Sequence, residues 1–226
     1  MQPPFTSEQF FEVFRLYNQS VWPVQLVLML GAMLLAASAI GGSRSSGYIA
    51  IGLASLWVWM AIAYHLAFFA RLTPAAYGFA AVFLVEAALL AWHGMRTRRL
   101  RFGMPVQRRA MITGVTLVLF ALFGYPAIAH ALGQRYPALP TFGLPCPTTI
   151  FTFGLLTLAV RPIPRSVLVI PIAWALLGTV AALRLGARED FSLLPAVLLA
   201  LTVVLEPLSH AQGTALQPER PFQVRS

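Results

Sequence analysis

One stretch of the chain combines a thiol, hydroxyl groups and helix-breaking residues at the mouth of an apolar segment. Residues 140–154 read PTFGLPCPTTIFTFG, and Cys146 is the only cysteine of the chain. Pro147 suits the first position of a helix, because its missing amide hydrogen has no intrahelical partner there. Cys146 is then expected at or near the N-cap, with the amides of Thr148 and Thr149 pointing out of the helix end unpaired. A helix start of this kind, set below the membrane surface, suits binding of an anion or a polar substrate.

A second interpretation of the same stretch needs no ligand. The prolines and Gly143 can simply fold a loop over the end of a helix bundle. Cys146 is then a small buried apolar side chain, which is the usual role of an unpaired cysteine. The sequence leaves both interpretations open.

Three other side chains are candidates for the same site, and one more is a candidate for proton transfer. Tyr64, His65 and Tyr136 are expected around the helix start as substrate-binding residues. Glu86 lies in the middle of an apolar segment, where a charged carboxylate costs several kcal/mol or more and is usually functional. We therefore take Glu86 as a proton-carrier candidate. A packed interhelical His65 and a neutral, hydrogen-bonded Glu86 are the structural alternatives.

The motifs of metal and phosphate chemistry are missing from the sequence. No two histidines stand three or four residues apart, the spacing that places two metal ligands on one helix face. A glycine-rich phosphate loop and a serine nucleophile elbow are also missing. We therefore predict no metal, no cofactor and no catalytic residue, and an enzymatic role is disfavoured. One alternative keeps a metal- or haem-linked redox function that uses His65, His130 and Cys146.

The composition indicates a protein whose solvent is lipid. Hydrophobic residues make up 58% of the 226-residue chain and charged residues only 10%, against about a quarter charged in soluble domains. All 16 basic residues are arginine, and six of them fall within residues 96–109. This clustering is typical of a juxtamembrane loop and argues against nucleic-acid binding. The lack of lysine excludes a retinal protein, which needs a lysine amine for its Schiff base.

The hydrophobic pattern predicts an all-α polytopic membrane protein with about seven transmembrane helices. A spanning helix needs about 20 residues, which the first four segments and the sixth provide. The fifth and seventh are too short to cross a full hydrocarbon core alone, and the fifth could be re-entrant. The predicted segments are Trp22–Ile40, Tyr48–Ala70, Pro74–Trp92, Ala110–Ala131, Pro147–Val160, Ser166–Leu183 and Ser192–Leu205.

Three regions follow from this pattern. Residues 1–21 are expected to form an amphipathic helix that lies on the outer membrane interface, with Thr6 or Ser7 as its cap. Residues 22–206 form the transmembrane bundle, and residues 207–226 a flexible cytoplasmic tail. Seven spans would place 11 arginines on one side and 5 on the other. The positive-inside rule then puts the amino terminus outside and the carboxyl terminus in the cytoplasm.

Four polar, aromatic and proline- or glycine-rich stretches are expected on the outer side, where they would build any site. They are YNQSVWP, YHLAFFARLTPAAYG, GQRYPALPTFGLPCPTT and GAREDFS, and they overlap the segments LYNQSVWPVQ, AIAYHLAFF with LTPAAYGF, YPALPTFGLPCPTTIFTFG and LGAREDFSLLPA. These segments resemble a bacterial integral-membrane family catalogued as domain of unknown function 6064. The resemblance covers the chain up to about Leu205, and residues 136–154 are its most specific part. It implies a multi-pass protein of the bacterial inner membrane and supplies no activity.

Three functions are consistent with these features. The first is binding, with or without transport, of a small solute or ion through an outward-facing site at the start of the fifth helix. The second is a non-catalytic membrane subunit or scaffold, whose partner is another membrane protein or a second copy of the chain. The third is the redox role described above. The lipid bilayer is a partner in all three, and nucleic acid in none.

Overall fold

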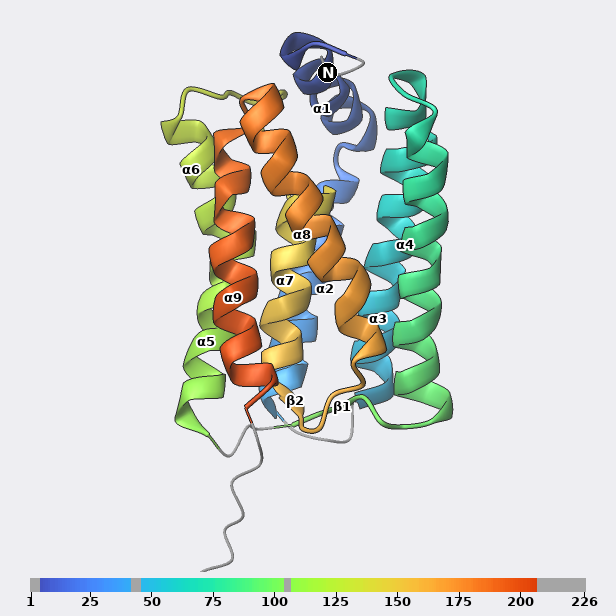
Figure 1. The fold of residues 1–226 in the computed structure, drawn as a ribbon, viewed down its shortest axis with the longest axis vertical. Coiled ribbons are helices and arrows are strands. Elements are labelled where there is room, and N and C mark those ends of the chain that lie inside the picture. The colour runs from blue at the N-terminus through green and yellow to red at the C-terminus, as the bar shows by residue number, and fades with distance from the viewer. Residues whose placement is uncertain (1–4, 42–45, 104–106, 207–226) are drawn as a thin grey trace, which may run out of the picture.

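The computed structural model describes residues 5–41, 46–103 and 107–206, which form an all-α bundle (Figure 1). Short π-helical or 3-10 turns extend several of the helices, as η2 (Met60–Leu66) extends α3. Two short strands, β1 (Arg101–Phe102) and β2 (Ala159–Val160), pair at one end of the bundle. The α-helices are α1 (Ser7–Val21), α2 (Val24–Gly41), α3 (Ser46–Trp59), α4 (Ala75–Ala91), α5 (Arg108–Leu119), α6 (Tyr125–Ala131), α7 (Pro145–Thr157), α8 (Ser166–Leu185) and α9 (Leu193–Val204).

Five continuous helical segments among the described residues are long and apolar enough to cross a membrane. They coincide with the five predicted segments of sufficient length, which confirms an all-α protein with several membrane-type helices. α7 and α9 have 13 and 12 residues, or about 20 Å at 1.5 Å per residue. A count of seven spans therefore stays a prediction. The five segments are Val24–Gly41, Ser46–Arg71, Ala75–Arg96, Arg108–Ala131 and Ser166–Leu185.

α7 is the central helix of the bundle. It packs against α5, α8 and α9, and Figure 1 shows it enclosed between them. Every residue of α7 except Cys146 is buried. The sequence of α7 explains this position, because a helix that is apolar on all sides belongs in a core. Its threonines are compatible with burial where they bond within the bundle: Thr152 Oγ1 donates to the Thr148 carbonyl and accepts from the Trp57 indole.

α5 and α7 approach each other closely where Gly154 faces Val118. A Cβ on Gly154 would lie 3.0 Å from the Val118 backbone nitrogen and 3.1 Å from the Gly114 carbonyl oxygen. Backbone atoms cannot rotate away as a side chain can, so a methyl group at this position must push the two helices apart. Small residues at such crossings let membrane helices pack by van der Waals contact.

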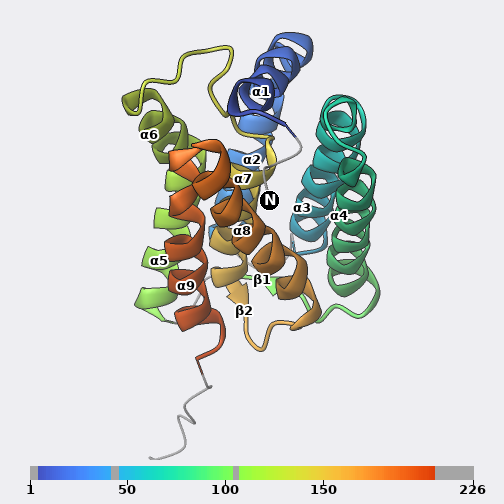
Figure 2. The same ribbon diagram turned by 45° about the horizontal axis from the view of Figure 1, so that its top comes forward.

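The two ends of the bundle differ. The four stretches that the sequence predicts on the outer side gather at the end where α1 lies across the bundle (Figure 2). β1 and β2 lie at the opposite end (Figure 1), where they pair antiparallel with Arg101 opposite Val160. The grouping of the four stretches at one end agrees with the sequence prediction. The side of the membrane on which that end lies stays a prediction.

α1 is amphipathic, as predicted, and begins with a capping box. The Thr6 side chain accepts from the Gln9 amide at 3.2 Å, and the Gln9 side chain accepts from the Thr6 amide at 2.9 Å. The apolar face of α1, which includes Phe10 and Phe14, packs onto protein residues such as Tyr64 rather than being left free. α1 therefore covers the bundle end. Its location at a membrane interface, like the boundaries of the three predicted regions, stays a prediction, and residues 207–226 lie outside the described part.

The contact at Gly154 predicts opposite effects for the same substitution at two helical glycines. Gly154→Ala should lower the melting temperature in detergent, because overpacking of a tight core costs about 1–3 kcal/mol. Gly78→Ala is the matched control, since a Cβ at Gly78 meets nothing within 4 Å. It should leave the melting temperature unchanged or raise it, because alanine favours a helix over glycine by about 0.5–1 kcal/mol. Equal melting temperatures for both variants would contradict the close α5–α7 packing.

Candidate binding cavity beneath the amino-terminal helix

A cavity of about 300 Å³ lies beneath α1, at the end of the bundle where α7 begins. Part of its lining comes from the start of α7 and from η6 (Arg188–Ser192), the 3-10 turn between α8 and α9. Eight of the 22 lining residues are aromatic, and they include Phe10, Phe14, Tyr64, Phe69, Phe79 and Trp174. The rings contact one another: the Tyr64 and Phe69 centroids lie 5.6 Å apart and those of Phe79 and Trp174 lie 5.4 Å apart.

The start of α7 forms the part of the cavity wall that the sequence singles out. The helix begins at Pro145, with Leu144 as its N-cap, so it starts two residues earlier than predicted. The Thr148 amide donates to the Leu144 carbonyl at 3.2 Å and is therefore not free. Because Pro145 and Pro147 carry no amide hydrogen, the first turn offers fewer donors than an ordinary helix start. The helix end is correspondingly a weaker anion site than expected.

Asn18 of α1 holds the loop that leads into α7. This fully buried side chain donates from Nδ2 to the carbonyls of Pro137 at 2.6 Å and Leu139 at 2.7 Å. Its Oδ1 accepts from Gln25 Nε2 at 2.6 Å and from Thr141 Oγ1 at 2.7 Å. A buried amide with all its partners fixes the backbone around it. The Asn18 network therefore sets the position of α7 relative to α1.

An acidic group lies at the inner end of the cavity. Asp190 is 2% exposed, and its carboxylate accepts a hydrogen bond from the Tyr125 hydroxyl. The Cys146 thiol lies beside the same carboxyl group. Burial raises the pKa of Asp190 to about 7, although the hydrogen bonds from Tyr125 and Cys146 favour the charged form. Asp190 is thus a carboxyl group that changes charge near neutral pH.

Glu189, the neighbour of Asp190, also carries a carboxyl group with a raised pKa, again mainly because of burial. Gln134 Nε2 donates to Glu189 Oε1 at 2.8 Å. This bond ties the loop before α7 to the turn before α9. Two adjacent acidic side chains therefore share this end of the bundle, and only Asp190 lines the cavity.

The structure brings together some of the predicted site residues and separates others. Tyr64 and Cys146 line the cavity. His65 is fully buried behind the wall, where its ring lies 5.3 Å from Trp174 and 4.6 Å from Phe83. Tyr136 is half exposed and lies outside the lining, with its hydroxyl donating to the Asn18 carbonyl at 3.4 Å.

Four residues that the sequence predicts as functional are buried and have side-chain polar atoms without a hydrogen-bond partner among the described residues. They are His65, Glu86, Thr148 and Thr149. Glu86 lies on the buried face of α4 and does not line the cavity. The packing that His65 makes with Phe83, one helical turn before Glu86, separates the cavity from that carboxyl group. The roles predicted for His65, Thr148 and Thr149 in substrate binding and for Glu86 in proton transfer stay predictions.

The placement of His130 bears on the redox alternative. His130 is exposed near the end of α6, whereas His65 is fully buried. Within the described residues, no three histidine, cysteine or acidic side chains lie together as a metal site requires. The set of His65, His130 and Cys146 therefore does not form one site in this structure.

The sequence comparison decides the family. The model of the family of unknown function DUF6064 matches residues 7–213 of the chain. The chain belongs to this family. The matched range covers the helices from α1 to α9, including all elements that build the cavity. Comparisons with curated proteins and with solved structures gave no match. DUF6064 membership therefore confirms the resemblance and gives no activity.

Sequence reasoning missed several residues of this DUF6064 cavity. Asp190 belongs to the stretch GAREDFS but is not among the predicted site residues, and neither Tyr125 nor Trp174 is among them. The available signal for Asp190 was a pair of adjacent acidic residues next to a predicted helix end in a chain with few acidic residues. Nothing in the sequence signals Trp174, because its role depends on the side of α8 that faces α4 and His65 of η2.

The raised pKa of Asp190 predicts a pH-dependent stability. In the unfolded chain an aspartate has a pKa near 4, so the folded protein binds the proton more tightly and loses stability as the pH rises from about 4 to about 7. In the Asp190→Asn variant this loss should shrink by up to about 4 kcal/mol. Chemical denaturation in detergent at pH 4, 6 and 8 measures the effect.

Glu189 titrates with the same sign, so a further Glu189→Gln change should reduce the slope that Asp190→Asn leaves. Glu12→Gln, on the exposed face of α1, is the control and should follow the wild-type pH dependence. A stability of Asp190→Asn that falls with pH as steeply as that of the wild type would contradict burial of a protonated Asp190.

Proposed function

We propose that the protein binds a small, mainly apolar molecule carrying one cationic or hydrogen-bond-donating group in the cavity beneath α1. One observation carries this proposal. Asp190 is the only acidic side chain among the described residues that line the cavity, and eight of the 22 lining residues are aromatic. The proposal keeps the predicted binding of a small solute at the start of α7, and the residues that line the cavity specify the class of solute.

The chemistry of the wall favours an ammonium group. Aromatic faces attract cations through their quadrupoles, and rings around a quaternary ammonium are a recurring recognition site. A carboxylate adds direct charge attraction, which is strong where water is excluded. Since the pKa of Asp190 is about 7, a bound cation should favour the ionised form and release a proton.

The volume and the rim indicate a small ligand that can arrive from an apolar phase. A volume of about 300 Å³ is at the lower end of the usual range for ligand pockets. Leu177 and Val180 of α8 line the cavity and are about half exposed. On a helix that crosses a membrane, exposed apolar side chains face lipid. From these exposed side chains and the arginine asymmetry of the sequence, we place the cavity at the outer side of the bacterial inner membrane.

Translocation is a separate step with less support. The buried Glu86 carboxyl group has no partner among the described residues, as expected for a proton carrier. Because Glu86 does not line the cavity, transport coupled to it requires the Phe83 and His65 side chains to move. Binding is therefore the function that we propose first.

Two probes of the same shape test the proposal. Benzyltrimethylammonium carries a positive charge, and neopentylbenzene replaces its nitrogen by carbon. The purified full chain in nanodiscs should bind benzyltrimethylammonium saturably, with an affinity that rises from pH 6 to pH 8 as Asp190 ionises. Asp190→Asn should weaken this binding at least about ten-fold, the loss expected for a desolvated charge partner, and change neopentylbenzene binding little.

Glu12→Gln is the matched control for this experiment. It removes one negative charge at the same end of the bundle, from a side chain 46% exposed on the outer face of α1. This variant should bind both probes as the wild type does. Equal binding of benzyltrimethylammonium by the wild type and by Asp190→Asn would overturn the role of Asp190, and no saturable binding of either probe would overturn the proposed function.

A further inference from the structure

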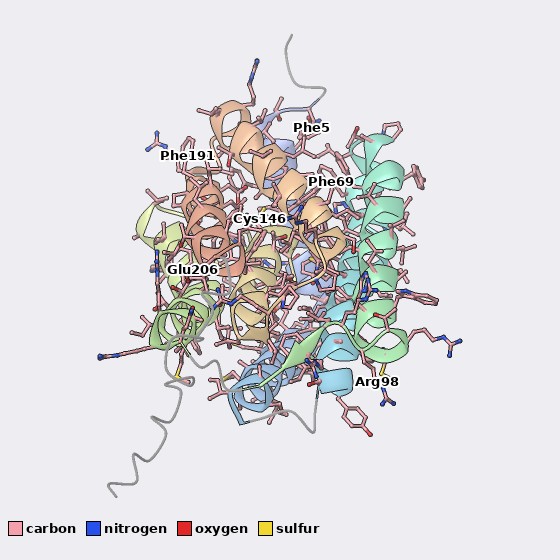
Figure 3. The ribbon with its side chains drawn as sticks, turned by 60° about the horizontal axis from the view of Figure 1, so that its bottom comes forward. Phe5, Phe69, Arg98, Cys146, Phe191 and Glu206 are labelled. Atoms are coloured by element: carbon pink, nitrogen blue, oxygen red, sulfur yellow. The ribbon has the colours of Figure 1, made fainter. Side chains whose placement is uncertain are left out.

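A second pocket lies at the opposite end of the bundle, away from the cavity beneath α1. Its volume is about 420 Å³, and it is formed by the loop from α4 to β1 and the segment from β2 to α8. Figure 3, which turns this end toward the viewer, labels Arg98 on the first of these loops. The lining is Arg98, Arg99, Arg101, Val160, Arg161, Pro162, Ile163 and Pro164. Among the described residues, four arginines and no acidic side chain therefore line this pocket.

The two walls of the pocket are fixed to each other. β1 and β2 pair antiparallel, with Phe102 opposite Ala159. Leu100 and Phe102 are fully buried on either side of Arg101, so the apolar side chains anchor the loop while the arginines stay outside. Ser46 Oγ bonds both the amide and the carbonyl of Phe102 at 3.0 Å. The α4–β1 loop that carries these arginines is therefore fixed in position by the surrounding structure.

The backbone at Arg98 supports the same conclusion. Its φ is +50°, in the left-handed region that costs energy for a residue with a side chain. Such a conformation persists only where the surrounding structure fixes it, and it is frequent at binding sites. The Leu100 amide, two residues later, donates to the His93 carbonyl at 3.0 Å and closes this turn onto the end of α4.

The charge of the pocket is mostly uncompensated. Arg161 lies 3.6 Å from Glu206 and donates to the Val203 carbonyl at 2.8 Å and to the Gln107 side chain. By contrast, Arg98, Arg99 and Arg101 form no salt bridge with any described acidic side chain. Like charges gathered on a fixed loop repel one another, and a bound anion removes this repulsion.

The pocket also lies where a lipid headgroup would be. The candidate span Ala75–Arg96 ends two residues before Arg98, and the candidate span Ser166–Leu185 begins two residues after Pro164. The pocket therefore opens between the ends of two membrane-type helices. Basic pockets at this level bind the headgroups of anionic lipids, and guanidinium groups bind phosphate oxygens in pairs.

We propose that the pocket formed by Arg98, Arg99, Arg101 and Arg161 binds a phosphate-bearing anion, either the headgroup of an anionic lipid or a free phosphate. This inference does not depend on the cavity at the other end or on its ligand. Binding at this pocket would hold the α4–β1 loop against the β2–α8 segment and so stabilise the bundle end.

The test uses the purified full chain in a neutral detergent. The probes are dioctanoylphosphatidylglycerol, the zwitterionic dioctanoylphosphatidylcholine and inorganic phosphate. The protein should bind phosphatidylglycerol at least about ten-fold more tightly than phosphatidylcholine, and the Arg99→Gln/Arg101→Gln variant should lose about this factor. Arg96→Gln/Arg108→Gln is the matched control, because it removes the same charge from the same end but outside the pocket. It should change the affinity by less than about two-fold.

The phosphate arm identifies the source of the anion. Displacement of the lipid by inorganic phosphate would show that free phosphate is sufficient for binding. Lipid binding that phosphate does not displace would assign the site to a lipid headgroup. Both results support anion binding at this pocket. Equal affinity for the two lipids, or equal losses in the two double variants, would overturn the proposal. The melting temperatures of both variants without ligand, expected to match the wild type, show that the comparison concerns folded protein.

Discussion

The burial of α7 on every side is the constraint on which the rest of the structure depends. A helix in this position can expose no unpaired backbone group, so both its start and the loop that reaches it must be satisfied by protein. Asn18 and Gln25 supply hydrogen bonds to that loop, and Pro145 and Pro147 remove amides that would otherwise lack acceptors. Gly154 lets α5 approach closely enough to cover one side of the helix.

The cavity lies at the start of the same helix. α7 has 13 residues, and its start lies at the end of the bundle that α1 covers (Figure 2). Phe10 and Phe14 of α1 line the cavity there. The turn before α9 then brings Asp190 to the inner end of this space, against Tyr125 and Cys146. Asp190 therefore faces this cavity, whereas Glu189 on the same turn bonds Gln134 and does not line it.

The sequence predicts the helices well and the contacts between them poorly. Five predicted spans and the amphipathic α1 agree with the structure, because continuous apolar runs and caps are local signals. The start of α7 differs by two residues, since either proline satisfies the rule for the first helical turn. Asp190, Trp174 and Asn18 were not predicted as site or anchoring residues because their roles depend on partners far along the chain. Conversely, Tyr136 looked equivalent to Tyr64 in the sequence, yet only Tyr64 lines the cavity.

Labelling of Cys146 tests the central claim that the start of α7 forms a wall of an open, outward-facing cavity. Since this is the only cysteine, a small membrane-impermeant thiol reagent applied to intact cells reports on that position alone. Our account predicts that Cys146 reacts from the outside in the folded protein, slowly because burial and the neighbouring Asp190 carboxyl group raise the pKa of its thiol, and that benzyltrimethylammonium slows the reaction further. A thiol that stays unreactive until the protein is denatured would contradict it, and would mean that residues 140–149 form a closed, packed loop.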